Sequence, residues 1–318
     1  MRVFRPWAFQ GSLKRKNYFE GWYFKHVSAD HKQVWSFIPG ISLSGGNSHA
    51  FIQVINGMTG ETQVHEYKLS EFFGSSKDLD VTLGGSRFST GGISLEIRNN
   101  SHQISGEISY SSADLYPSSL LNPGIMGWYS FVPFMECKHG VVSMQHELSG
   151  VLQIDKQTVD FNGGTGYIEK DWGSSFPESW IWLHCNTFNN SRSSFTFSVA
   201  KIPWLGSYFI GFISYLRLED RIINLSTWSR ARIERLEYID NNLRLRLSNK
   251  KYVLDIDAHN NQAGQLKAPV KGSMTRIIKE TVDATLDLKL TDRSGKVLFH
   301  DQGTRAGMEL IDKILEYF

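Results

Sequence analysis

The sequence predicts an all-β protein of two antiparallel barrel-like halves, with a helix at the C-terminus. Apolar and polar residues alternate with a period of two over many short segments, and Gly, Asn and Asp residues separate these segments. The length of 318 residues exceeds what one small barrel needs, which favours two halves. We place the halves at residues 1–170 and 171–318, with the junction in the stretch 163–177, where Gly and Ser accumulate.

Four groups of alternating segments predict hairpins or meanders. In chain order, the predicted strands are 94–98 with 103–110, 148–154 with 158–161, 235–239 with 243–247 and 252–256, and 284–290 with 297–300. Turn-forming residues connect them, for example at 99–102 and 292–295. Helical periodicity is clearest in the tail, where the apolar residues 308, 311, 314, 315 and 318 form one stripe. We expect this tail to be a helix that packs on a barrel or sheet.

Composition argues against several functional classes. Hydrophobic residues make up 41%, and the formal net charge of +2 is too small to indicate a nucleic-acid partner. We interpret the short basic cluster 14–16 as a solvated turn. The apolar window 202–218 is too short and too interrupted to span a bilayer. Because the start of the sequence has no signal-peptide pattern, we expect a cytoplasmic protein, and peripheral contact with a membrane for substrate uptake stays open.

Known cofactor and catalytic motifs are not matched. Residues 163–166, GGTG, lack both the spacing of a dinucleotide loop and the Lys of a P-loop. The ten histidines form no metal-binding pair, and Cys137 and Cys185 form no metal-type or redox motif. No Gly-x-Ser-x-Gly elbow is present. We therefore expect no metal and no cofactor.

The segment 179–186 separates into two faces if it is a strand. Trp180, Trp182, His184 and Asn186 share one face, and apolar residues fill the other. The first face combines aromatic surface with hydrogen-bonding tips, as the inside of a ligand-holding barrel does. The alternative is an ordinary strand whose Trp and His polar atoms bond to neighbouring backbone.

In the segment 167–172, extended chain places Tyr167, Glu169 and Asp171 on one face and Lys170 and Trp172 on the other. Carboxylates are rare in such apolar company. An acid held there has a raised pKa and can stay protonated near neutral pH. The structural alternative is that Glu169 and Asp171 pair with Lys170 or with an arginine.

A second segment, 19–26, also mixes acid with aromatic surface. Glu20 and Trp22 share one face of this predicted strand, and Tyr23 lies on the other. The same argument makes Glu20 a candidate acid. Its structural alternative is a contact that ties the end of a strand.

These stretches resemble the signatures of a known family. Residues 17–25, NYFEGWYFK, resemble the "FFEGWYF" opening of the tocopherol cyclase family, and residues 163–177, GGTGYIEKDWGSSFP, resemble its "GGxGYxEKNWGxxFP" signature. Residues 180–186, WIWLHCN, are similar to its "WxWxQCN" continuation. Asp171 and His184 depart from this pattern, which has Asn and Gln there. Because order and spacing agree, we expect the resemblance to cover most of the chain.

The resemblance implies two lipocalin-like β-barrel halves and a reaction that needs neither a redox cofactor nor a metal. Tocopherol cyclase closes a chromanol ring on a prenylated hydroquinone: an acid protonates the alkene, and the phenol oxygen traps the resulting tertiary carbocation. Related barrel proteins hydrate carotenoid double bonds by a similar protonation.

The sequence supplies residues that suit this chemistry. Alkene protonation needs a water-shielded acid, for which Glu20, Glu169 and Asp171 are the candidates. His184 would hold the hydroquinone oxygen or relay a proton. Aromatic faces stabilise a carbocation by ~2 kcal/mol each when desolvated. The candidate substrate-binding residues are Trp22, Tyr23, Tyr167, Lys170, Trp172, Trp180, Trp182 and Asn186.

We therefore expect a cofactor-independent, tocopherol cyclase-like isomerase or hydratase whose partner is a hydrophobic small molecule, either a prenylated aromatic compound or an isoprenoid. One alternative is a non-catalytic lipocalin-like carrier of a lipid, quinone or pigment, in which the acids are structural. Another is a purely structural β protein whose signatures are fold determinants. The sequence does not specify an oligomeric state.

Overall fold

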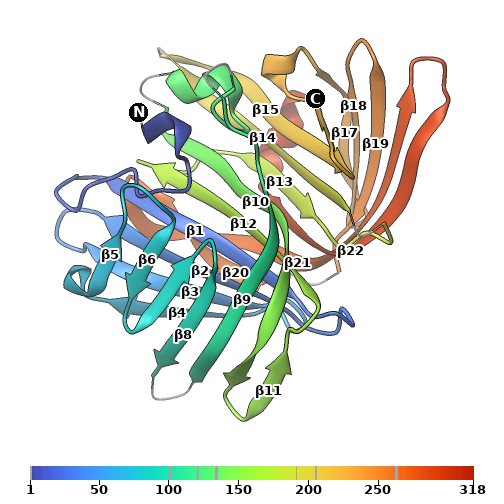
Figure 1. The fold of residues 1–318 in the computed structure, drawn as a ribbon. Coiled ribbons are helices and arrows are strands. Elements are labelled where there is room, and N and C mark those ends of the chain that lie inside the picture. The colour runs from blue at the N-terminus through green and yellow to red at the C-terminus, as the bar shows by residue number, and fades with distance from the viewer. Residues whose placement is uncertain are drawn as a thin grey trace. The chain divides into compact units, whose positions relative to one another are not determined.

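The computed structural model describes residues 2–99, 102–119, 122–132, 135–190, 192–204, 206–261 and 264–318. This chain is all-β, as predicted, and its strands form two antiparallel sheets (Figure 1). It divides into two compact units. The first comprises Met1–Asn56, Glu61–Phe176 and Leu266–Ile277, and the second comprises Gly57–Gly60, Pro177–Gln265 and Ile278–Phe318.

The first sheet has twelve strands in the order β4-β3-β2-β1-β12-β10-β9-β8-β7-β6-β5, with β11 paired to β10. Its central strands β1 and β12 are buried on both faces over most of their length, whereas β8 alternates between buried and exposed residues. Polar side chains of β1 and β12 are therefore shielded from water on either face. The bounds are β1 Tyr18–Val27, β2 Val34–Leu43, β3 His49–Asn56, β4 Glu61–Tyr67, β5 Phe72–Gly74, β6 Asp80–Leu83, β7 Ser86–Ser89, β8 Gly92–Arg98, β9 Gln103–Leu115, β10 Cys137–Ile154, β11 Gln157–Asp160 and β12 Gly164–Gly173.

The second sheet has ten strands in the order β16-β15-β14-β13-β22-β21-β19-β18-β17, with β20 paired to β21. The residues of β13 that were predicted to be apolar and core-facing, Ile181, Leu183 and Cys185, lie in the core of the second unit. The bounds are β13 Trp180–Cys185, β14 Ser193–Trp204, β15 Ser207–Leu218, β16 Arg221–Asn224, β17 Arg232–Ile239, β18 Asn242–Ser248, β19 Tyr252–His259, β20 Gly264–Val270, β21 Ser273–Asp292 and β22 Val297–Leu310.

All four predicted groups of strands are confirmed: β8 pairs with β9, β10 with β11, β17 with β18 and β18 with β19, and β21 with β22. Strands β10 and β22 extend well beyond the predicted segments, because their added residues pair with β12 and β13. Strand β21 is also longer than the predicted segment. Residues 100 and 101 of the first predicted turn lie outside the described residues.

The helices among the described residues are short 3-10 turns: η1 Arg2–Phe4, η2 Leu69–Glu71, η3 Gly127–Phe131, η4 Thr227–Ser229 and η5 Asp312–Tyr317. The predicted C-terminal helix is therefore shorter than its apolar stripe indicated. Met308 and Leu310 belong to β22, where they pair with Leu183 and Ile181 of β13, and this pairing extends the strand at the expense of the helix. In the described part of the chain, no helix has the length and apolarity needed to cross a membrane.

The core of the first unit contains a buried polar cluster at the bulges of β10. His26 is completely buried, and its Nε2 lies 2.7 Å from the hydroxyl of Tyr110. The His146 ring packs against that of Tyr110 in a tilted arrangement with centroids 4.2 Å apart, and its Nδ1 lies 2.9 Å from the Ser143 hydroxyl. Burial lowers the pKa of His26 to about 3 and that of His146 well below its ordinary value of 6.5. Both imidazoles are therefore neutral in the folded protein near neutral pH.

This cluster predicts a loss of stability in acid. Because His26 binds a proton only near pH 3 when folded but near pH 6.5 when unfolded, its stabilising contribution is present above pH 6.5 and is lost as the pH falls from there toward 3. At about pH 5 the free energy of unfolding should be ~2 kcal/mol lower from His26 alone. Urea unfolding at a series of pH values measures this change.

The matched variants are His26→Gln, which removes the titrating group, and His259→Gln, which alters an exposed histidine. We expect His26→Gln to flatten the dependence of unfolding free energy on pH, and His259→Gln to leave it as in the wild type. An unchanged pH dependence in His26→Gln would contradict the assignment.

Candidate active site

The candidate site lies where β12 pairs with β10. In this register Asp171 is opposite His139, and Glu169 is opposite Val141. Because side chains alternate along a strand, Tyr167, Glu169 and Asp171 project from the same face, as the sequence predicted. Tyr23 of β1 is opposite Glu169 on the other side of β12, and its hydroxyl accepts a hydrogen bond from Ser36.

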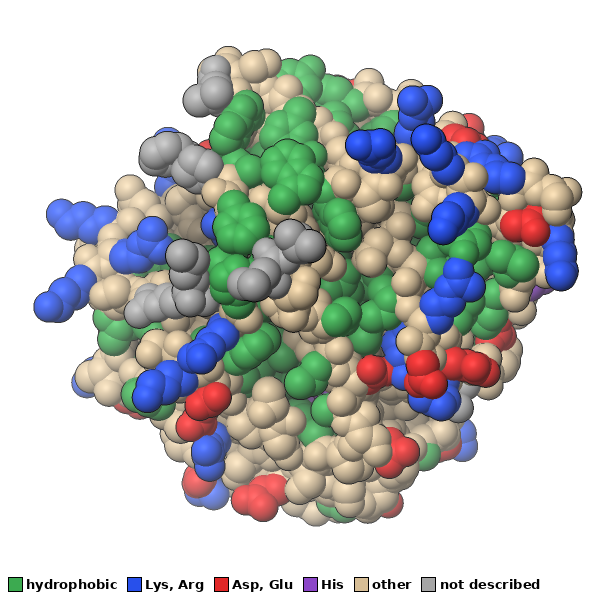
Figure 2. Space-filling view, turned by 45° about the horizontal axis from the view of Figure 1, so that its top comes forward, with side chains coloured by type: hydrophobic (Ala, Val, Ile, Leu, Met, Phe, Trp, Pro, Cys, Tyr) green, Lys and Arg blue, Asp and Glu red, His purple; other side chains and the backbone are tan. Residues whose placement is uncertain are grey.

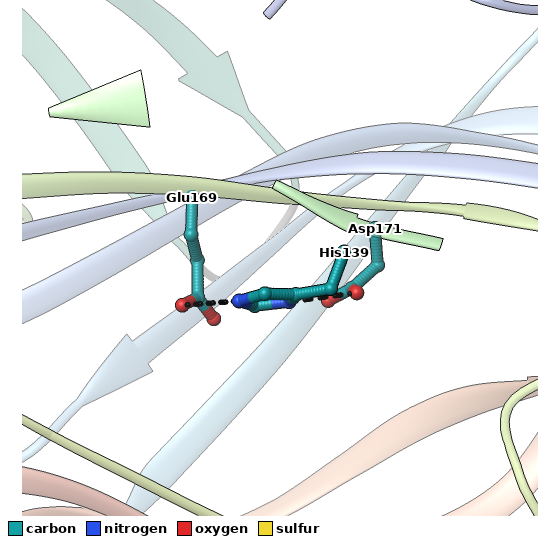
Figure 3. Close-up of side chains that lie close together, drawn as sticks. All are labelled: His139, Glu169 and Asp171. Atoms are coloured by element: carbon teal, nitrogen blue, oxygen red, sulfur yellow. Dashed lines mark hydrogen bonds and ion pairs between the residues drawn. The ribbon is translucent and has the colours of Figure 1, made fainter. Parts of the chain in front are cut away.

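Four side chains on this face form a continuous polar chain, the acid relay: Tyr167, Glu169, His139 and Asp171. Figure 3 shows the last three of these side chains. The Tyr167 hydroxyl donates to Glu169 Oε2 at 2.6 Å. His139 lies between the two carboxylates, with Nε2 3.5 Å from Glu169 Oε2 and Nδ1 3.0 Å from Asp171 Oδ1. The Glu169 side chain is 7% exposed and that of Asp171 is 27% exposed, so the relay runs from a shielded carboxyl group to one in contact with water.

A cavity of about 110 Å³ reaches this relay at His139. Its wall also includes Trp172, Ser130 of η3, and Pro6 and Gln10 of the N-terminal segment. Pockets that enclose a drug-sized ligand measure ~300–1,000 Å³, so this cavity admits water-sized molecules and not a whole prenylated aromatic compound.

The same three residues form a donor set that a divalent metal would accept. His139, Glu169 and Asp171 each offer one ligand atom, and these atoms lie within 4.8 Å of one another. In the observed geometry, however, each imidazole nitrogen faces a carboxylate. That arrangement also suits proton exchange through the ring, because imidazole can bind a proton at either nitrogen.

The opposite face of β12 carries a buried ion pair. Lys170 and Glu20 are both fully buried, with Nζ 2.5 Å from Glu20 Oε1, and Lys170 also donates to the Ala8 carbonyl. The ammonium group lies 4.7 and 4.9 Å from the ring centroids of Trp22 and Trp172. Burial lowers the pKa of Lys170 to about 8, and the charge of Glu20 opposes this shift.

Glu20 is held by further donors. Its carboxylate accepts hydrogen bonds from the Tyr18 hydroxyl at 2.5 Å and from the backbone NH groups of Gln10 and Gly11 at 2.8 and 2.9 Å. These contacts, together with Lys170, fix the carboxylate in place at the start of β1. The structure thus favours the alternative role for Glu20: it ties the N-terminal segment 8–11 to the start of β1.

The remaining predicted residues belong to the second unit and form a cluster of their own. Trp180, Trp182, His184 and Asn186 are all buried. The Trp182 and His184 rings lie nearly parallel, with centroids 6.2 Å apart. Trp180 donates its indole NH to Glu309 Oε2 at 2.5 Å. Sequence reasoning missed both Glu309 and His139, because each meets its partner only through the pairing of strands that are not neighbours in the sequence.

Comparison with known proteins shows the family to which the chain belongs. The tocopherol cyclase-like family model matches residues 97–311, which is more than half of the chain. The chain belongs to this family. The matched range contains the whole acid relay and the Trp180–Asn186 segment, and Glu20 lies outside it.

Curated relatives include "Probable tocopherol cyclase, chloroplastic" of Oryza sativa subsp. japonica and "Tocopherol cyclase, chloroplastic" of Zea mays. Each is 24% identical over 196 residues, which cover 58% of this chain and 41% of the relative. The chain thus spans less than half the length of the curated relatives it matches.

Solved structures of similar fold include CghA with Sch210972 and kievitone hydratase from Nectria haematococca. Their TM-scores are 0.58 and 0.51, at 11% and 10% identity, and each match covers 92% of this chain and 88% of the other. At this identity the likeness shows the fold, and it agrees with the lipocalin-like all-β architecture predicted from the sequence.

The buried ion pair yields a stability prediction. In Glu20→Gln, Lys170 keeps a buried charge without its carboxylate, so we expect the free energy of unfolding to fall by about 3–5 kcal/mol. Urea unfolding at neutral pH measures it. The double variant Glu20→Gln, Lys170→Met removes both charges and should recover much of the loss. A double variant no more stable than Glu20→Gln would show that the pair contributes little.

Proposed function

We propose that the protein catalyses acid-promoted cyclisation or hydration of a carbon–carbon double bond in a hydrophobic substrate, a prenylated hydroquinone or related isoprenoid. Glu169 is the acid. The observation that carries the proposal is the acid relay, in which a shielded carboxyl group is connected through His139 to a partly exposed Asp171. Family membership and the names of the plant relatives support the substrate class.

Glu169 begins the cycle as a neutral carboxylic acid and transfers its proton to the alkene. The conjugate base that forms accepts the Tyr167 hydrogen bond at 2.6 Å and lies beside the His139 ring. Groups that stabilise the carboxylate strengthen the parent acid. The surroundings of Glu169 therefore combine shielding from water with a hydroxyl donor and an imidazole beside the carboxylate that forms.

The tertiary carbocation is consumed by oxygen. In cyclisation the phenol oxygen attacks the cation and releases its own proton, whereas in hydration a water molecule attacks and releases one. Either reaction returns the proton that Glu169 supplied, so turnover is proton-neutral. The released proton passes to water, and the partly exposed Asp171 takes up a proton from water. His139 accepts this proton at Nδ1 as it passes one to Glu169 from Nε2, and proton exchange with water restores its starting tautomer.

We expect Glu169→Gln to lower turnover of a prenylated hydroquinone by about 100-fold or more, because general acid catalysis typically contributes 10²–10⁴-fold. Asp171→Asn should have a smaller effect and should change the pH dependence of turnover, because it breaks the relay at its solvent end. Incubation with substrate followed by mass spectrometry of the products measures both.

Glu147→Gln is the matched control, because Glu147 is an exposed carboxylate on β10 outside the acid relay. It should retain wild-type turnover. Full activity in Glu169→Gln would remove Glu169 from the mechanism. Tight binding of the substrate by the wild-type protein without any conversion would favour the carrier function instead.

A further inference from the structure

The sequence around η3 is unlike the rest of the chain in its charge. Residues 115–135 contain no charged residue. The N-terminal nineteen residues show the opposite bias, because they contain five Lys or Arg residues and no acid. These two segments meet in the fold: the rings of Phe131 and Phe4 pack edge to face, with centroids 6.0 Å apart.

The aromatic side chains of η3 face outward. Trp128 is 52% exposed and Phe131 is 49% exposed. Trp128 stacks on Tyr129 with ring centroids 4.1 Å apart, so packing holds its exposed surface in place. Single exposed apolar residues are ordinary on protein surfaces, but two large aromatic residues exposed within one helical turn, beside an uncharged sequence, indicate an interaction surface.

Basic residues lie at the end of the first sheet to which η3 also leads. Lys14, Arg15 and Lys16 are exposed and directly precede β1, next to Leu13, which is 42% exposed. The start of β1 pairs with the end of β12, and the end of β12 pairs with the start of β10, which follows η3 in the chain. Figure 2 shows hydrophobic side chains gathered at the surface with Lys and Arg side chains near them.

The surface is also connected to the acid relay. Ser130 of η3 and Lys138 line the cavity that reaches His139, and Lys138 Nζ donates to the Ser130 carbonyl at 2.9 Å. Pro6 and Gln10 of the N-terminal segment complete the same wall. The exposed aromatic residues and the cavity are thus built from the same two segments.

We propose that a docking face, formed by Trp128 and Phe131 of η3 and by residues 13–16, binds peripherally to a lipid bilayer that carries anionic headgroups. Trp and Phe side chains partition into the interfacial region of a bilayer, and each nearby Lys or Arg strengthens attraction to an anionic surface about fivefold. Docking would bring this end of the first unit to the phase in which an isoprenoid substrate dissolves. The role of docking in substrate access rests on the proposed function, whereas the docking itself does not.

Vesicle co-sedimentation without any substrate tests the docking face. The probes are phosphatidylcholine vesicles and vesicles of equal parts phosphatidylcholine and phosphatidylglycerol. We expect the wild-type protein to bind the anionic vesicles and to bind the neutral vesicles at least about tenfold more weakly. Two double variants alter the docking face: one combines Lys14→Gln with Lys16→Gln, and the other combines Trp128→Ser with Phe131→Ser. Each should weaken binding to anionic vesicles by about tenfold or more.

The matched control is the double variant Val151→Ser with Lys156→Gln. Both residues lie at the β10–β11 hairpin, which is at the opposite end of β10 from η3. Val151 is 37% exposed and Lys156 is exposed, so this variant removes similar groups and should bind like the wild type. The proposal is overturned if the wild type does not bind anionic vesicles, if it binds neutral vesicles equally well, or if docking-face variants and control behave alike.

Failure of docking and failure of the proposed function are distinguishable. If the protein converts detergent-dispersed substrate but does not bind vesicles, the docking proposal is wrong and the proposed function stands. Vesicle binding by a protein that converts no substrate supports the docking face and counts against the enzyme.

Discussion

The register of β12 between β1 and β10 is the constraint on which the site depends. This strand carries Tyr167, Glu169 and Asp171 on one face and Lys170 and Trp172 on the other. A slip of one residue would exchange the two faces. Glu169 would then lose His139, and Lys170 would lose Glu20. The register is held on both sides, because β12 is a central strand buried for most of its length.

The two faces of β12 show two ways of burying charge in one short sequence. On one face, Lys170 is neutralised by Glu20, capped by a backbone carbonyl and enclosed by two indole rings. On the other, two carboxyl groups flank one imidazole. The first arrangement is closed, because every charge has a fixed partner. The second can exchange protons, since a histidine can bind at either nitrogen and one carboxyl group reaches water.

The N-terminal segment connects these two features. Glu20 and Lys170 bind backbone groups of residues 8–11, and Pro6 and Gln10 of the same segment form part of the cavity wall at His139. Glu20 thus holds in place a segment that forms part of the cavity wall. A catalytic role for Glu20 stays a prediction, and the proposed acid is Glu169.

The sequence by itself determined what depends on local alternation. The period-two pattern specified the hairpins, the apolar face of β13 and the partition of residues 167–172 between two faces, because side-chain direction in a strand follows from sequence position. Its two signatures also indicated the family. The tertiary structure alone decided which acid meets which base. His139 and Asp171 are 32 residues apart and Lys170 and Ala8 are 162 apart, and no local pattern encodes the register that joins them. The pairing of β22 with β13 likewise shortened the tail helix, because long-range backbone hydrogen bonds outweigh a local helical stripe.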